Sequence, residues 1–303
     1  PLTPSPPHPL SPFTPSAPQQ GVRMALTTWP YNHHNHSSYS DGEGTLREHA
    51  EFALESGVEV LGLSDHAPMD GASEWCMMPS RLEAYRDEVL GLKREFGGRI
   101  EVALGLEVDW YPGHPEYLER VRAFSWDYLI GSTHYVETPE GRWPVDESAE
   151  ATEAAVERLF AGSHRAACEA YFARHAEAAA SGHFDVLGHL DLCKKFNRAS
   201  CYFDEGEPWY RDAVEAVVEA AARTDTIVEV NTAGLAKAVG AFYPSPWILE
   251  RCIHHGARVT LNSDSHSPRT VQYRFPQTLE ALRVLGIREL WRWSKGAWGA
   301  VEI

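Results

Sequence analysis

The sequence predicts an α/β protein in which parallel strands form a closed barrel covered by helices. Short apolar runs alternate with longer amphipathic runs about seven times along the 303 residues, which is typical of repeated strand–helix units. The glycine patterns of open nucleotide-binding sheets, GxGxxG and the P-loop, are missing, and so is the GxSxG nucleophile turn. A closed barrel is therefore favoured over an open doubly wound sheet.

The first residues do not fit this pattern. Residues 1–18 contain 8 of the 20 prolines, which lack the N–H group that a regular ladder needs. We expect residues 1–24 to form a disordered proline-rich tail. Residues 25–303 are then close to the size typical of a single barrel domain.

Seven apolar runs are the predicted strands. Each is short, and polar or turn-forming residues follow it closely. They span residues 28–36, 58–66, 100–107, 128–134, 184–190, 226–231 and 258–264.

Helix-like segments separate these runs. The segment 45–56 begins with Thr45 and has Glu48 three residues later, which is the pattern of a capping box. An alanine-rich stretch over 147–181 is predicted as two helices broken at Gly162. The remaining predicted helices span 80–96, 208–224 and 246–255.

Composition limits the class of protein. The formal net charge of −16 argues against nucleic acid as a partner, because such a surface repels phosphate backbones. No apolar run is long enough to span a membrane and no secretory signal is visible, so we expect a cytoplasmic enzyme-sized protein. The five scattered cysteines contain no CxxC pair, which disfavours both a disulfide framework and a zinc finger.

Metal-type side chains follow six of the seven predicted strands. In parallel barrels the carboxyl ends of the strands carry the functional groups. The candidate ligands at these strand ends are His34, His36, His66, Glu107, His134, His189, Asp264 and His266.

The spacing of these residues indicates a shared cavity. Side chains two apart on a strand share a face, so His34 and His36 point together, as do Asp264 and His266. Asp65 precedes His66 directly and is expected to support it rather than bind the same ion. Imidazoles and carboxylates suit Zn, Fe or Mn. The set exceeds the three or four ligands of one zinc, so we expect two or three ions, with Glu107 or Asp264 as a bridge.

The other histidines are interpreted as structural. His33 is an uncertain neighbour of the candidate ligands. No chemistry is expected of His8, His49, His114, His164, His175, His183, His254 and His255.

Six ordered motifs resemble those of the polymerase and histidinol phosphatase (PHP) superfamily. They are HNHSSYSDG at 34–42, LGLSDH at 61–66, GLEVD at 105–109, GSTH at 131–134, GHLD at 188–191 and NSDSH at 262–266. Within the superfamily the sequence is most similar to the histidinol-phosphate phosphatases, through SDHAP at 64–68, HLDLCKKF at 189–196, VEVNTAGLAK at 228–237 and YPSP at 243–246.

The resemblance implies a distorted (β/α)7 barrel with a trinuclear metal centre, and it adds Asp41 to the ligands. His34, His36 and Asp264 would hold one ion, which Glu107 bridges to a second. The second ion would be held by His134 and His189, and the third by Asp41, His66 and His266.

The implied reaction is hydrolysis of L-histidinol phosphate in histidine biosynthesis, with a metal-activated water as the nucleophile. Asp264 and Asp191 are the candidate catalytic carboxylates, Asp191 as a proton donor or orienting group. A carboxylate is also expected to hold the cationic amine of histidinol, and Asp109, which shares a face with Glu107, could play this part or that of Asp191. Lys194, Lys195 and Lys237 are candidates for phosphate contact, where relatives commonly have arginine. Asn32 stands where the family often has a supporting aspartate.

Three alternatives remain open. A PHP enzyme could act on another phosphate ester, such as a nucleotide or an oligonucleotide. An amidohydrolase also begins with HxH on a barrel, but it would want a carboxylated lysine where this chain has His134. A non-catalytic module would have lost ligands, and none of the nine is lost.

Overall fold

The computed structural model describes residues 28–69 and 75–303, so the expected tail at 1–24 and His8 lie outside the described residues. Each of the seven predicted strand regions contains a strand, and the seven form one parallel sheet in the order β1-β2-β3-β4-β7-β8-β9. Their bounds are β1 Tyr31–Asn32, β2 Val60–Leu63, β3 Glu101–Asp109, β4 Tyr128–Ser132, β7 Val186–Leu187, β8 Ile227–Asn231 and β9 Val259–Asn262.

The sheet curls until its two edges meet just beyond β1 and β9. Asn35 and Ser265 form an isolated parallel bridge there. The backbone N–H of His36 donates to the Ser265 carbonyl at 2.7 Å, and that of Ser265 donates to the His34 carbonyl at 3.1 Å. The result is a nearly closed barrel of seven parallel strands, as the sequence predicts.

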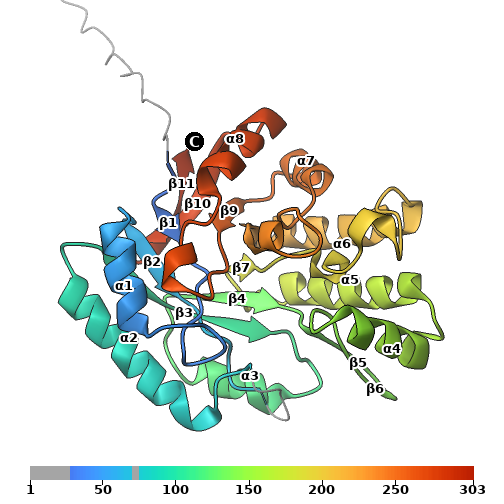
Figure 1. Cartoon of the computed structure of the whole chain (residues 1–303), viewed down its shortest axis with the longest axis horizontal. Coiled ribbons are helices and arrows are strands. Elements are labelled where there is room, and N and C mark those ends of the chain that lie inside the picture. The colour runs from blue at the N-terminus through green and yellow to red at the C-terminus, as the bar shows by residue number, and fades with distance from the viewer. Residues whose placement is uncertain (1–27, 70–74) are drawn as a thin grey trace, which may run out of the picture.

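Helices lie around the outside of the barrel (Figure 1). The capping box predicted at Thr45 is present, with reciprocal contacts to Glu48. The predicted break at Gly162 is also present, because α4 ends before this residue and Ser163 caps the start of α5. The helices are α1 Leu46–Glu55, α2 Leu82–Phe96, α3 Pro115–Arg122, α4 Ala149–Phe160, α5 His164–Ala180, α6 Pro208–Thr224, α7 Pro246–His255 and α8 Phe275–Leu285.

Two helices, α3 and α8, and two antiparallel hairpins were not expected from the sequence. One hairpin joins β5 Tyr135–Thr138 to β6 Gly141–Pro144, directly after β4. The other joins β10 Glu289–Ser294 to β11 Ala297–Glu302 at the end of the chain. Both hairpins are short and mix polar with aromatic residues. Their hydrophobic periodicity, from which strands are predicted, is therefore weaker than that of the buried parallel strands.

The first predicted strand is shorter than expected, because side chains take over its hydrogen bonds after Asn32. The His33 N–H donates to Asn262 Oδ1 at 2.8 Å, and the Asn35 N–H donates to Ser64 Oγ at 3.1 Å. The Ser37 N–H donates to Asp65 Oδ1 at 2.8 Å. Side-chain acceptors and the isolated bridge to Ser265 therefore anchor this segment in place of a continuous backbone ladder.

Tyr128 fills the barrel interior between two glycines. Its hydroxyl donates to the His33 carbonyl at 2.5 Å. A Cβ built on Gly62 would lie 2.1 Å from the Tyr128 hydroxyl oxygen, and one built on Gly105 would lie 2.2 Å from its Cζ. Glycine is therefore required at both positions for this ring to pack.

All five cysteines are free thiols, in line with the lack of a disulfide framework. Among the described helices, none combines the length and apolar character that crossing a membrane requires.

Candidate metal centre

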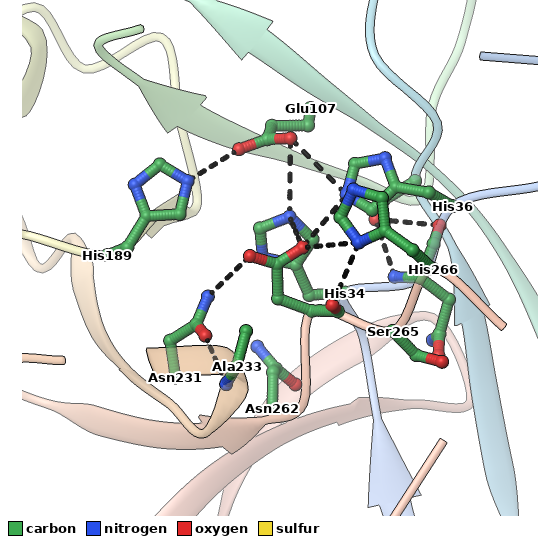
Figure 2. A network of polar contacts seen from close by, with 12 residues as sticks. His34, His36, Glu107, His189, Asn231, Ala233, Asn262, Ser265 and His266 are labelled. Carbon is green, nitrogen blue, oxygen red and sulfur yellow. Dashed lines mark hydrogen bonds and ion pairs between the residues drawn. The ribbon is translucent and has the colours of Figure 1, made fainter. Parts of the chain in front are cut away.

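Strand ends from around the barrel converge on Glu107, which lies near the end of β3 (Figure 2). Its carboxylate is 1% exposed. Oε2 faces one group of imidazoles, at 3.3 Å from His34 Nε2 and 2.8 Å from His66 Nδ1. Oε1 faces a second group, at 3.0 Å from His189 Nε2 and 3.7 Å from His134 Nε2. The two oxygens of one buried carboxylate thus face separate sets of ligand-type nitrogens, which suits a bridging ligand.

A second carboxylate, that of Asp264, lies beside His34 and His36, the two histidines that follow β1. Its Oδ1 lies 3.2 Å from His36 Nε2 and 3.6 Å from His34 Nε2. His266 Nδ1 lies 3.6 Å from the same oxygen, while His266 Nε2 lies 3.2 Å from Asp41 Oδ2. We call the whole set the metal cage: His34, His36, Asp41, His66, Glu107, His134, His189, Asp264 and His266.

The metal cage fits divalent cations. His34 Nε2, His36 Nε2 and Glu107 Oε2 are buried and have no hydrogen-bond partner among the described residues. Buried polar atoms normally find a partner, so three such atoms within 4.8 Å of one another indicate a site for a bound ion. Three overlapping groups of cage residues have ligand atoms close enough together to share an ion. The structure therefore contains His/Glu clusters that could bind metal.

The charges of the cage are strongly coupled. Burial opposes protonation of His34, but the Glu229, Asp264 and Glu107 carboxylates outweigh it and raise its pKa well above the usual value. For Glu107, burial favours the neutral acid, but the surrounding imidazoles outweigh it and hold its pKa well below the usual value. The carboxylates therefore hold protons on imidazoles of the metal-free cage, and a bound cation would displace those protons, because metal ligands bind in their deprotonated forms.

Glu229 on β8 contacts two cage residues, His34 and His189. It was not singled out from the sequence. It is fully buried, with Oε1 2.7 Å from His34 Nδ1 and Oε2 accepting the His189 N–H at 3.0 Å. Asn231 and Asn262 also donate to it. The signal was an acidic residue within the otherwise apolar run VEV. Glu229 gives His34 the carboxylate support that Asn32 cannot give.

Asp109 and Asp65 also act on cage residues. Asp109 Oδ1 accepts the backbone N–H of His134 at 2.6 Å, and its Oδ2 lies 3.2 Å from His134 Nδ1. This contact orients the ring so that Nε2 faces Glu107. Asp65 lies outside the cage and binds Ser37 and Ser40, so it supports the loop that carries Asp41.

Two predicted roles need correction. Asp191 is fully buried; its Oδ2 lies 2.7 Å from Lys194 Nζ and accepts the Ser245 N–H at 2.9 Å. Lys194 is 1% exposed and also donates to Ser245 Oγ. These two residues neutralise each other behind the cavity wall, because a buried charge needs a close partner. Lys194 is therefore not placed to contact phosphate, nor Asp191 to donate a proton.

A cavity of about 350 Å³ opens above the cage. Lys195 and Lys237, two of the three lysines predicted to contact phosphate, line this cavity. Lys195 Nζ lies 3.1 Å from Asp146 Oδ2 and also donates to the Asp146 carbonyl. Lining residues not expected from the sequence include Trp75, Tyr135, Pro144, Asp146, Glu147, Leu192, Ala233 and Tyr243.

Two of the histidines interpreted as structural, His175 and His255, and the uncertain neighbour His33 make contacts outside the cage. His175 is buried between Thr133 Oγ1 at 2.9 Å and the Gly188 carbonyl at 3.0 Å. His33 Nε2 lies 3.2 Å from the Trp293 carbonyl and points away from the cage. His255 pairs with Glu215 on the surface of α6.

Comparison with known proteins places this barrel in a family. Residues 32–233 match the model of the PHP domain, and the chain belongs to the PHP domain family.

Relatives within that family carry a more particular name. The chain is 37% identical over 248 residues to the probable histidinol-phosphatase of Deinococcus radiodurans, covering 81% of this chain and 89% of that protein. It is 26% identical over 254 residues to the histidinol-phosphatase of Bacillus subtilis, covering 78% and 92%.

Solved structures share the fold. A putative histidinol phosphatase from Listeria monocytogenes superposes with a TM-score of 0.68 at 20% identity, covering 82% of this chain and 99% of that one. The histidinol phosphate phosphatase of Lactococcus lactis, solved with zinc, L-histidinol and phosphate, gives a TM-score of 0.67 at 20% identity, covering 89% and 98%.

Proposed function

We propose that this protein is a metal-dependent phosphomonoesterase that hydrolyses L-histidinol phosphate to L-histidinol and phosphate in histidine biosynthesis. The observation that carries the proposal is the metal cage around Glu107 beneath a cavity of about 350 Å³. The name shared by its curated relatives from Deinococcus radiodurans and Bacillus subtilis supports the choice of substrate.

The cage would hold two or three divalent ions, with zinc, iron or manganese suited to its imidazole and carboxylate donors. His34, His36 and Asp264 form the first set, His134 and His189 the second, and Asp41, His66 and His266 the third, with Glu107 between them. Such ions supply charge stabilisation on the phosphoryl oxygens and lower the pKa of a coordinated water.

The chain's own residues have three tasks in this reaction. Lys237 lines the cavity and provides positive charge for the phosphate, and Lys195 lines it beside Asp146, with which it shares its charge. Asp264 also lines it, with Oδ2 held by Asn231 at 3.1 Å and Oδ1 on the cage side, so this carboxylate is placed to orient the attacking water. The cavity of about 350 Å³ suits a small organic part, and the net charge of −16 disfavours an oligonucleotide.

The test combines metal analysis with phosphate release from L-histidinol phosphate. We expect His134→Ala to lose bound metal and turnover together, and His164→Ala, on a distant helix, to keep both. Lys237→Ala should chiefly raise KM. Wild-type turnover in His134→Ala would contradict the metal assignment. A wild-type protein that prefers a nucleoside monophosphate over L-histidinol phosphate would contradict the substrate.

A further inference from the structure

We infer that Glu147 binds the ammonium group of the substrate and that Trp75 and Tyr135 form the face for its heteroaromatic ring. This inference rests on the proposed function, in which the phosphoryl group lies on the metal cage. It assigns the part of the cavity that the phosphate does not use.

The carboxylates that line the cavity differ in what they contact. Asp41, Glu107 and Asp264 all face cage histidines. Asp146 is engaged by Lys195, whose Nζ lies 3.1 Å from its Oδ2. Glu147 is exposed at the edge of the cavity, and no hydrogen bond or ion pair joins its side chain to the described residues. It is therefore the lining carboxylate whose charge is available to a cationic ligand.

The position of Glu147 is set by the backbone that leads to it. Val145 is buried, and its N–H donates to the His134 carbonyl at 2.9 Å. Ser148 caps α4 through the Ala151 N–H at 3.0 Å. Glu147 lies between these two anchors, so the segment after β6 holds it at a defined place relative to a cage residue.

An aromatic face runs outward from the cage on the side of Trp75. The Trp75 ring centroid lies 4.5 Å from that of His66 and 5.2 Å from that of His134. Tyr135 continues this face, with its ring stacked 5.8 Å from Trp75 at an interplanar angle of 24°. The Trp75 Nε1–H donates to the Tyr135 hydroxyl at 3.3 Å, which fixes the two rings together. This face lies next to the cage, and aromatic faces stack favourably on a planar ring.

The charges outside the cage match an amino-alkyl phosphate. Lys237 is exposed at the cavity and pairs with no carboxylate of residues 28–69 or 75–303, while Asp146 and Lys195 neutralise each other. The cavity thus offers one cationic group for a phosphate and one anionic group for an ammonium. A phosphate ester without an amine would leave Glu147 unused.

The experiment measures discrimination between L-histidinol phosphate and its deamino analogue, which keeps the ring and the phosphate. Glu147→Gln should lower the ratio of the two kcat/KM values about fivefold, which is the upper range for a solvent-exposed ion pair. The loss should appear in KM rather than kcat. Glu150→Gln, an exposed acid three residues further on, is the matched control and should leave the ratio unchanged.

Tyr135→Leu tests the aromatic face separately. It should lower the ratio of kcat/KM for the deamino analogue to that for phosphoethanolamine, which has an amine but no ring. An unchanged ratio in Glu147→Gln would overturn the ammonium site, and an unchanged ratio in Tyr135→Leu would overturn the ring site. A wild-type protein that hydrolyses neither imidazole ester would instead overturn the proposed function, and the inference with it.

Discussion

Replacing Glu229 by glutamine removes the support beneath the metal cage while keeping the shape of the side chain. Glu229 accepts from four groups within 3.0 Å: His34 Nδ1 at 2.7 Å, Asn262 Nδ2 at 2.9 Å, and the His189 N–H and Asn231 Nδ2 at 3.0 Å each. Glutamine offers one oxygen and one NH2 group. Each carboxylate oxygen of Glu229 accepts from two donors, so whichever way the glutamine amide is turned, its NH2 group faces two donors and cannot accept from them. Two hydrogen bonds are therefore lost.

The size of the effect follows from these contacts. A hydrogen bond to a charged group contributes about 1.5 kcal/mol or more, so the loss of two lowers the free energy of unfolding by about 3 kcal/mol. The His34 ring also loses the acceptor that holds Nδ1 and aims Nε2 at the cage. Changes to such supporting carboxylates typically weaken metal binding by about 10- to 100-fold.

Two measurements check this expectation: urea unfolding of the metal-free protein and zinc affinity by competition with a chelator. Asp185→Asn is the matched control, because Asp185 accepts the Leu129 N–H at 2.9 Å and the Trp298 Nε1–H at 3.2 Å before the start of β7, away from the cage. This control should lose stability but keep its zinc affinity. Wild-type zinc affinity in Glu229→Gln would refute the reasoning, even if the variant were less stable.

Two further predictions concern packing and pH. Gly105→Ala should lower the free energy of unfolding by about 3 kcal/mol, because its Cβ would lie 2.2 Å from Tyr128 Cζ. The control Gly91→Ala in α2, where a Cβ would have nothing within 4 Å, should be neutral or stabilising. Urea unfolding of both variants measures the difference, and equal effects would contradict the packing argument. Burial lowers the pKa of His175 to about 3. Because the unfolded chain takes up a proton below pH ~6.5 and the folded protein does not, His175 should cost about 2 kcal/mol of stability between pH 6.5 and 5. His175→Gln should therefore show a shallower fall in stability than wild type over that range, and an identical fall would contradict the assignment.

The sequence by itself determined the parallel barrel and the placement of its ligand-type residues. Strand periodicity puts His34 and His36 on one face, and parallel strands bring their carboxyl ends to the same end of a barrel. Those two local rules gather eight of the nine cage residues around Glu107, and the ninth, Asp41, was added by the resemblance to the PHP superfamily because it lies in the loop after the first strand. The capping box at Thr45 and the break at Gly162 are equally local, so they too were readable from the residues alone.

Only the tertiary structure decided how the charged residues pair. Lys194 and Lys195 are neighbours in sequence, yet one is buried against Asp191 and the other reaches the cavity, because the short 3-10 turn Leu192–Lys194 sends them in different directions. Glu229 supports His34 across 195 positions of sequence. Such pairings depend on the distances that folding creates between remote segments, and neither periodicity nor spacing contains those distances.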